Sequence, residues 1–313
     1  MVKQLPIAAE PDDGCGQRAG RRSAVRYLRN EASPSATRMV LGAALRRRRE
    51  AISLMSGEAA EQLGGSRSKM SRIESGNSSF KEQDLLRFFS MYEITDPEDQ
   101  DRLRELAAIA RQPAWWQPWS TVAQKYLQAF VSFEDMAVRV RSFETVYLYG
   151  LLQTPEYARA LIERGRGTTS QHEELIRLRA ERWERFVAAP EKKLICIVDE
   201  ASLRRPVGSP AIMRGQLRHL IELTSHPSIQ LRLAPLNNYK VHVELGPTTT
   251  FDFAGHLLPT ICFAEGFDGG LVVDDEQMVD RRVKAFDALA ASSLSPIATK
   301  RRLQDLLAAT RYA

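Results

Sequence analysis

Cysteine and histidine are scarce in this chain of 313 residues. Its three cysteines, Cys15, Cys196 and Cys262, are too few and too widely separated to form a disulfide framework. Cys196 lies within a short apolar run, so we expect it to be a core residue. The five histidines are scattered, and no pair of cysteines or histidines has the spacing of a zinc site. We therefore expect neither disulfide bonds nor a bound metal.

Long apolar runs and phosphate-binding loops are missing as well. No segment approaches the roughly 20 apolar residues of a membrane span, and residues 1–38 contain no run that could serve as a signal peptide. We therefore expect a cytoplasmic protein without a membrane partner. No glycine-rich phosphate loop is present, and no set of side chains suits catalysis, so we expect no cofactor and no enzyme activity. The acidic residues 274–276 could chelate a hard cation, although such runs are more often solvated loops.

Acidic residues are outnumbered by basic ones. The chain has 44 lysines and arginines against 39 aspartates and glutamates, a net charge of +5 and a pI of about 9.2. This balance fits a polyanionic partner. The excess is stronger over residues 64–81, which contain a single acid, Glu74. The cations of this stretch are Arg67, Lys69, Arg72 and Lys81.

Residues 41–76 have the pattern of three short helices joined by tight turns. Leu41, Leu45 and Ile52 recur about one and two turns apart, which places them on one side of a first helix. Ser56 is expected to cap a second helix.

The third helix follows a pair of glycines at positions 64 and 65, which permit a sharp turn. Ser66 is expected to cap this helix, Met70 and Ile73 to face inward, and Gly76 to end it. A fourth helix is expected next, with apolar positions at Leu85, Leu86, Phe88, Phe89 and Tyr92.

The third helix leaves its basic and hydroxyl side chains free for DNA. Arginine and lysine can donate to guanine edges in the major groove, whereas serine more often contacts phosphate. The pattern therefore predicts a helix-turn-helix with a recognition helix. The predicted DNA-binding residues are Ser56, Ser66, Arg67, Ser68, Lys69, Ser71 and Arg72.

The sequence SRSKMSRIESG at residues 66–76 resembles Xre-type (Cro/repressor-like) helix-turn-helix regulators, and the resemblance extends over residues 39–95. It implies an all-helical domain that binds double-stranded DNA, commonly as a homodimer. Three positions depart from the family pattern. Arg48 replaces a leucine, Met55 replaces a serine or threonine cap, and Gly65 replaces an apolar turn residue. These departures suggest that Arg48 loses a core contact or extends its stem along the surface, and that the cap shifts to Ser56.

The segments on either side of residues 39–95 are interpreted differently. Residues 1–38 are expected to be a flexible tail, either a basic arm that contacts phosphates or an unstructured leader. Residues 96–120 are expected to form a connecting helix and a tryptophan-rich hinge. The hinge tryptophans could stack on bases, but they more often pack a second domain against its linker. They are Trp115, Trp116 and Trp119.

Residues 121–313 are predicted to form an α+β domain, so the fold class is mainly α with a mixed C-terminal domain. Thr154 is expected to cap a helix that has Pro155 at its first position. The charged helix 173–189 is expected to be a solvated face laced with ion pairs. Further strands are expected at 193–199, 229–235, 248–253, 259–265 and 271–273, and further helices at 213–225, 280–291 and 297–310.

The C-terminal part resembles the regulatory domain that follows the Xre-type unit in actinobacterial regulators of the WhiJ-like kind. The likeness rests on GLLQTPEYAR at 150–159 and DEASLRRPVG at 199–208. It implies an antitoxin-like transcriptional regulator, whose C-terminal domain is controlled by a small protein partner encoded nearby. The alternative is a one-component regulator that binds a small-molecule effector in the C-terminal domain.

Overall fold

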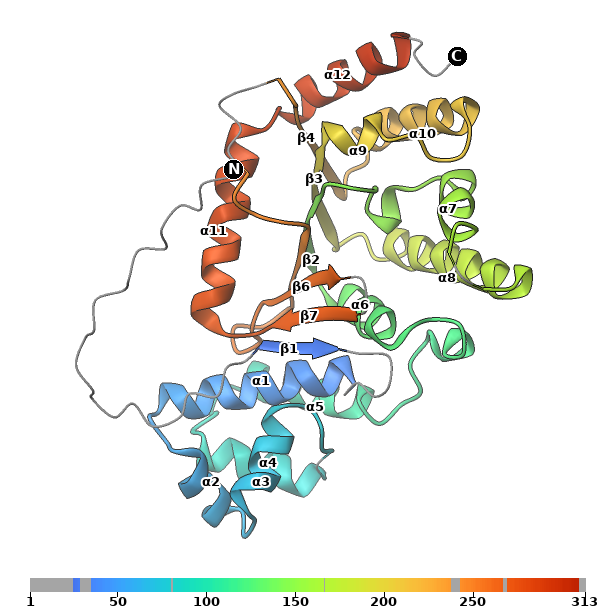
Figure 1. Ribbon diagram of the computed structural model, residues 1–313. Helices are drawn as coiled ribbons and strands as arrows, with labels where there is room; N and C mark the ends of the chain where they lie inside the picture. Colours follow the sequence, from blue (N-terminus) through green and yellow to red (C-terminus); the bar gives the residue numbers. More distant parts are fainter. Residues whose placement is uncertain are drawn as a thin grey trace, which may run out of the picture.

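The computed structural model describes residues 25–28, 35–79, 81–165, 167–237, 243–266 and 269–309. Its N-terminal part is a unit of helices, shown in blue to cyan in Figure 1. The helices of this unit are α1 (Ala36–Ala51), α2 (Ser56–Gln62), α3 (Arg67–Glu74), α4 (Glu82–Met91) and α5 (Pro97–Ile109). Helix α5 packs against α1 and α4 and buries Leu103 and Leu106, so it is part of the same helical unit.

The described strands form one seven-stranded mixed sheet, in the order β1-β7-β6-β5-β2-β3-β4. Strands β2, β3 and β4 run parallel, whereas the pairs on the other side of β2 are antiparallel. The strands are β1 (Val25–Leu28), β2 (Arg139–Glu144), β3 (Lys193–Asp199), β4 (Ile229–Ala234), β5 (Thr248–Asp252), β6 (Ile261–Gly266) and β7 (Gly269–Val273).

Helices cover both faces of this sheet (Figure 1). On one face lie α6 (Lys125–Met136), α7 (Pro155–Ile162), α8 (Thr169–Val187) and α10 (Pro210–Leu223). Helix α11 (Glu276–Ser292) covers the other face, and α12 (Pro296–Ala308) packs on β4 and α10. Short helices complete the chain at η1 (Gln117–Trp119), η2 (Gly150–Leu152) and α9 (Glu200–Arg204).

The expected fold class is confirmed: a helical N-terminal unit precedes a domain of mixed sheet and helices. Strand β3 has the predicted bounds, and Cys196 within it is buried as expected. Thr154 caps α7, because its hydroxyl accepts a hydrogen bond of 3.2 Å from the Tyr157 amide. Local patterns were therefore sufficient to locate most elements of the chain.

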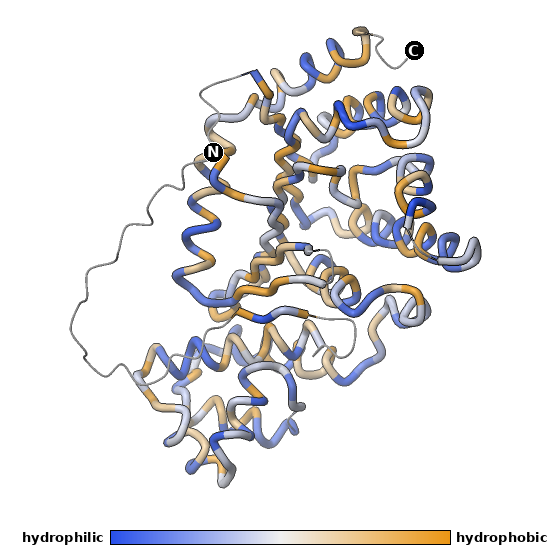
Figure 2. Tube along the Cα trace, in the orientation of Figure 1, coloured by the Kyte–Doolittle hydropathy of each residue, from blue (hydrophilic) through white to orange (hydrophobic). Residues whose placement is uncertain are grey.

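The helical unit and the sheet share one buried core. Met39 and Leu45 of α1 belong to the same apolar cluster as Phe133 of α6 and Phe251 of β5. Figure 2 shows the apolar colouring concentrated along the sheet and on the helix faces that cover it. The helical unit is thus packed onto the C-terminal domain.

Strand β1 corrects the expectation of a flexible tail over residues 1–38. It pairs antiparallel with β7, and α1 already begins at Ala36. Residues 1–24 and 29–34 of that segment lie outside the described residues. An edge strand of four residues carries too short a pattern to be seen in sequence, and its hydrogen-bond partner lies more than 240 residues further along the chain.

The acidic run at 274–276 is not a solvated loop. Asp274 is buried and forms ion pairs of 2.8 Å with both Arg26 of β1 and Arg46 of α1. Asp275 caps α11, since its carboxylate accepts a hydrogen bond from the Met278 amide. The end of β7 therefore joins the sheet electrostatically to the first helix of the N-terminal unit.

Burial corrects the expectation for the charged helix. Arg182 of the charged helix α8 is only 5% exposed, because it points into the domain and pairs with Glu134 of α6 at 2.8 Å. Leu86, one of the apolar positions of the expected fourth helix, lies on the exposed side of α4. Leu85, Phe88 and Phe89 of the same helix are buried, so α4 faces the core with one side and presents Leu86 to solvent.

The tryptophans of residues 111–119 pack against the C-terminal domain. The Trp116 indole donates a hydrogen bond of 2.6 Å to Ser132 of α6. The Arg185 guanidinium of α8 lies 4.8 Å from the centre of the Trp115 ring, and Trp119 meets Trp115 edge to face. These contacts agree with the interpretation that the tryptophans fix the linker to the second domain.

Candidate nucleic-acid interface

Helix α2 ends in a turn that glycine makes possible. Gly64 has a φ of +64°, and its amide donates to the Glu61 carbonyl at 2.9 Å. The Gly65 amide donates to the Ala60 carbonyl, also at 2.9 Å. These two bonds form a Schellman motif, which satisfies carbonyls at the helix end. The glycine pair therefore sets the sharp entry into α3 that the sequence predicted.

The start of α2 differs from the prediction. Ser56 is the first helical residue, and Met55 is the capping position. The Met55 amide donates a hydrogen bond of 2.8 Å to the Glu58 carboxylate, which is the contact that an acidic residue at the third helical position makes in a capping box. The prediction that Ser56 takes over the capping role is wrong, although the half-buried Ser56 still lies at the N-terminus of the helix.

Helix α3 has well-defined caps at both ends. The Ser66 hydroxyl accepts a hydrogen bond of 3.2 Å from the Lys69 amide, which confirms the predicted N-cap. Gly76 has a φ of +75°, and its amide donates to the Ile73 carbonyl at 2.9 Å. The Asn77 amide donates to the Arg72 carbonyl at 2.8 Å. This second Schellman motif confirms the predicted end of the helix.

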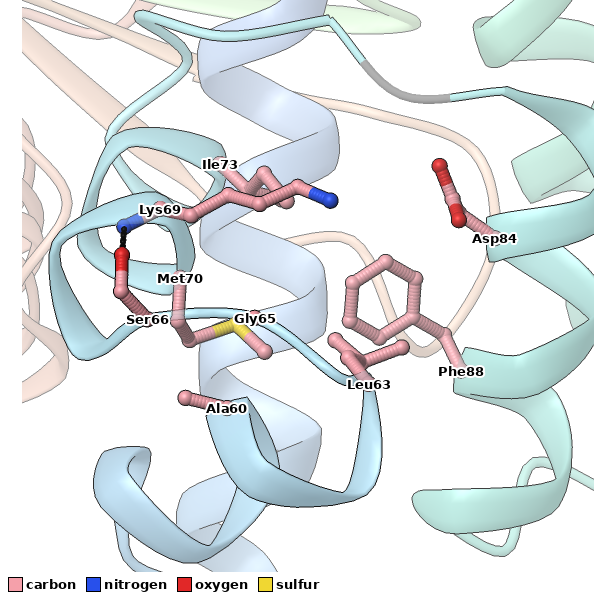
Figure 3. Close-up of a pocket in the computed structure, with 9 residues that line it drawn as sticks. All are labelled: Ala60, Leu63, Gly65, Ser66, Lys69, Met70, Ile73, Asp84 and Phe88. Carbon is pink, nitrogen blue, oxygen red and sulfur yellow. Dashed lines mark hydrogen bonds between the residues drawn. The ribbon is translucent and has the colours of Figure 1, made fainter.

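The inner side of α3 is held in an apolar pocket (Figure 3). Met70 and Ile73 are buried, as predicted. Met70 approaches Leu63 and Phe88 in the figure, and its sulfur lies 3.7 Å from the Tyr92 hydroxyl. Because these contacts come from both α2 and α4, they fix the rotation of α3 about its own axis.

A buried ion pair anchors the end of α3 to α1. The Arg49 guanidinium donates to both carboxylate oxygens of Glu74, at 2.6 and 3.0 Å, and to the Leu54 carbonyl at 2.8 Å. Both charged residues are less than 8% exposed. Burial alone would lower the pKa of Arg49, but its hydrogen bonds to Glu74 raise it above the usual value, so the guanidinium stays charged. The sequence analysis counted Glu74 only as an acid in a basic stretch and missed this role.

Close backbone contact between α1 and α3 requires two glycines. A Cβ added at Gly42 would lie 2.4 Å from the Ile73 carbonyl oxygen, and one at Gly76 would lie 2.7 Å from the Met39 amide. Any larger residue would push the recognition helix away from α1.

Arg48 has a structural role that its departure from the family pattern did not reveal. Its guanidinium donates hydrogen bonds of 2.8 Å to the carbonyls of Tyr92 and Glu93 at the end of α4. These carbonyls would otherwise lack a helical partner, and a cation at a helix C-terminus is also favoured by the helix dipole. Arg48 therefore replaces an apolar contact by a polar cap.

The outer side of α3 carries the predicted DNA-binding residues. With about 100° between successive residues, Ser68 and Arg72 lie opposite the buried side, while Arg67 and Lys69 flank them. All four are exposed, and Ser71 is half-buried. Within the described residues none of these cations forms an ion pair with a carboxylate. The structure thus brings Ser66, Arg67, Ser68, Lys69, Ser71 and Arg72 together on one helix, and Ser56 lies apart on α2.

Charge on this surface favours an anionic partner. The single acid of residues 64–81, Glu74, is buried and paired with Arg49. The exposed cations are therefore not offset by any acid of their own stretch. Basic groups on a protruding helix with satisfied caps form the footprint of a protein that binds DNA in the major groove.

Metal centres and membrane spans were looked for in the parts of the chain that the structure describes. There, no three or more histidine, cysteine, aspartate or glutamate side chains are placed to hold a metal ion together. Likewise, none of the helices in these ranges has the length and apolar character needed to cross a membrane.

Two families match this sequence. Residues 40–103 match a helix-turn-helix domain, a stretch that includes α2, α3 and α4. The protein is thus a DNA-binding regulator of the helix-turn-helix class. Residues 127–305, more than half of the chain, match the family described as Domain of unknown function (DUF5753), so the chain belongs to that family. No curated protein and no solved structure matches the chain.

Proposed function

We propose that the protein is an Xre-type transcriptional regulator that reads a specific sequence in double-stranded DNA with α3. The observation that carries this proposal is the exposed, unpaired basic side of α3, on a helix whose orientation is fixed by the Arg49–Glu74 pair and two close-packed glycines. Arg67, Lys69 and Arg72 donate to base edges or phosphates, and Ser66 and Ser71 contact phosphate.

A homodimer is part of this proposal. One recognition helix covers few base pairs, and two-fold dimers that bind half-sites about one helical turn apart (roughly 34 Å) are the usual solution. Light scattering of the complex should give the mass of two chains plus that of the DNA. Footprinting should give two protected half-sites. A monomer both free and on DNA would contradict the dimer.

Base reading is tested on an operator selected from a random pool of double-stranded DNA. Arg67→Ala should cost about 1–3 kcal/mol of binding free energy and relax preference at one base position. Arg301→Ala is the matched control, because Arg301 is an equally exposed arginine on α12, at the opposite end of the molecule. If Arg67→Ala and Lys69→Ala together leave operator affinity unchanged in a mobility-shift titration, α3 is not the recognition helix.

We further propose that the C-terminal domain controls DNA binding. Control by a small protein partner encoded nearby, as in an antitoxin, is supported by the WhiJ-like resemblance. Control by a small-molecule effector is supported by a cluster of charged side chains in this domain, which includes Glu144, Glu265 and Arg179. A partner or effector changes the populations of two domain arrangements only if it binds one of them more tightly than the other. Its effect must therefore reach the DNA-binding unit through contacts between the two parts of the protein. The Asp274 ion pairs and the packing of α6 on α1 supply such contacts.

A further inference from the structure

The strand order reverses beside β2. From β2 the chain continues to β3 and β4 on one side, and then returns to the other side with β5, β6 and β7. In open α/β sheets, ligands bind at the carboxyl ends of the parallel strands where the strand order reverses. Strand β2 ends at Glu144, so this residue lies at the carboxyl end of the last parallel strand, next to the antiparallel strand β5, and the side chains gathered there, more than the strand order, favour a ligand.

A second carboxylate lies on the same face of the sheet. Ser142 pairs with Thr249, and Thr249 pairs with Phe263. Two residues beyond these positions, Glu144 on β2 and Glu265 on β6 occupy the same level on either side of β5. Strands are about 4.8 Å apart, so the two backbones are separated by roughly 10 Å, and long side chains can approach each other between them.

Burial and the charge of Glu265 raise the pKa of Glu144 to about 8. The Glu144 carboxyl accepts a hydrogen bond from the Ser142 hydroxyl and remains partly accessible. It is therefore mainly uncharged at neutral pH, next to a carboxylate that is exposed to solvent. The other titratable groups that act on it or feel its charge are Arg182, Tyr149 and Cys196.

Helix α8 adds positive charge to this cluster. Arg182 is paired with Glu134, because its guanidinium donates to both carboxylate oxygens at 2.8 Å. Arg179 donates to the Gln153 side chain, but its buried Nε has no hydrogen-bond partner in the described part of the chain. Burial lowers the pKa of Arg179 to about 10, which still leaves it charged at neutral pH. An unsatisfied buried donor of this kind is costly unless a ligand accepts its hydrogen bond.

We propose that Glu144, Glu265 and Arg179 form a binding site for a small zwitterion, an amino acid or a close relative. The ammonium group binds between Glu144 and Glu265, and the carboxylate accepts the free hydrogen bond of Arg179. This inference rests on the proposed function and names its effector class. The ligand would contact β6, which pairs with β7, the strand that precedes Asp274. The ligand would also lie beside Tyr126 of α6, whose hydroxyl is hydrogen-bonded to Glu265.

The first experiment measures ligand binding in the absence of DNA. Each of the common L-amino acids is titrated into the full-length protein by calorimetry at pH 7, and the best binder is compared with its N-acetyl and amide forms. We expect one amino acid to bind and to lose at least about tenfold in affinity when either charged group is blocked. Binding should also release a proton from Glu144, which is measured by repeating the titration in buffers of different ionisation enthalpy. If none of the amino acids binds, the proposal is wrong.

Variants then test the residues. Glu144→Gln replaces a carboxyl that is already mainly uncharged, so the protein should fold, lose at least about tenfold in affinity and release no proton. Glu265→Gln and Arg179→Met should weaken binding to a similar extent, whereas Arg177→Ala, an exposed arginine on the same helix, should not. Equal affinity in Glu144→Gln and the wild type would overturn the site.

The operator titration separates this inference from the proposed function. Ligand that binds the free protein and changes operator affinity supports both proposals. Ligand that binds without changing operator affinity keeps the site but overturns its role as an effector site. Binding of the ligand by a protein that selects no DNA sequence would overturn the proposed function and leave the site intact.

Discussion

Replacement of Glu74 by alanine should strongly destabilise the recognition helix. The Arg49 guanidinium would lose both of its carboxylate hydrogen bonds while remaining buried. Removing one partner of a buried ion pair typically costs about 3–5 kcal/mol, and the half-exposed Glu50 carboxylate, 3.5 Å from the Arg49 guanidinium, offsets only part of that loss. Such a loss is a large share of the roughly 5–15 kcal/mol that stabilises a typical folded protein. We therefore expect Glu74→Ala to lower both the free energy of unfolding and operator affinity.

Urea denaturation followed by circular dichroism measures the change in the free energy of unfolding. The double variant Arg49→Met/Glu74→Leu is the informative control, because apolar replacement of a whole buried pair is often neutral or stabilising. It should recover most of the stability lost in Glu74→Ala. If the single variant costs less than about 1 kcal/mol, or if the double variant is as unstable as the single one, the pair does not anchor α3.

Three further predictions concern other parts of the molecule. Gly76→Ala should cost at least about 1–2 kcal/mol in thermal denaturation, since it imposes a left-handed backbone on a residue with a Cβ, whereas Gly57→Ala meets no atom within 4 Å and should be tolerated. Asp274→Asn removes the charge that holds Arg46, so amide hydrogen exchange in β1 and α1 should accelerate by about tenfold or more, and unchanged exchange would argue against the link. The raised pKa of Glu144, about 8 against 4.5 for a free carboxyl, means that the folded state retains a proton that the unfolded state has lost. The free energy of unfolding should therefore decrease as the pH rises from about 5 to about 8, and Glu144→Gln should reduce this pH dependence.

The amino-acid sequence by itself determined the DNA-binding unit in some detail. Ser66 and Gly76 mark the two ends of α3 because capping depends on hydrogen bonds within a few residues, which local sequence encodes. The spacing of Met70 and Ile73 determined which side of α3 is buried, and hence which side is free for DNA. The same locality explains why β3 was predicted with its observed bounds.

The N-terminus of α2 shows that residue type alone can predict the wrong capping position. Ser56 was a reasonable cap by residue type, but the Glu58 carboxylate reaches back to the Met55 amide and satisfies the helix start instead. The backbone of Met55 is extended, which places the helix boundary one residue earlier than predicted.

Tertiary structure alone decided which charged residues are structural. Arg182 belongs to a helix with the pattern of a solvated face, yet it is buried against Glu134, 48 residues earlier in the chain. Asp274 belongs to an acidic run, yet it is buried between two arginines, one of them 248 residues away. Sequence patterns report which residues share a face of one helix or strand, but the partner of a buried charge depends on which distant segments the fold brings together. For the same reason β1, Glu265 and the cluster at the end of β2 became visible only when the strands were paired.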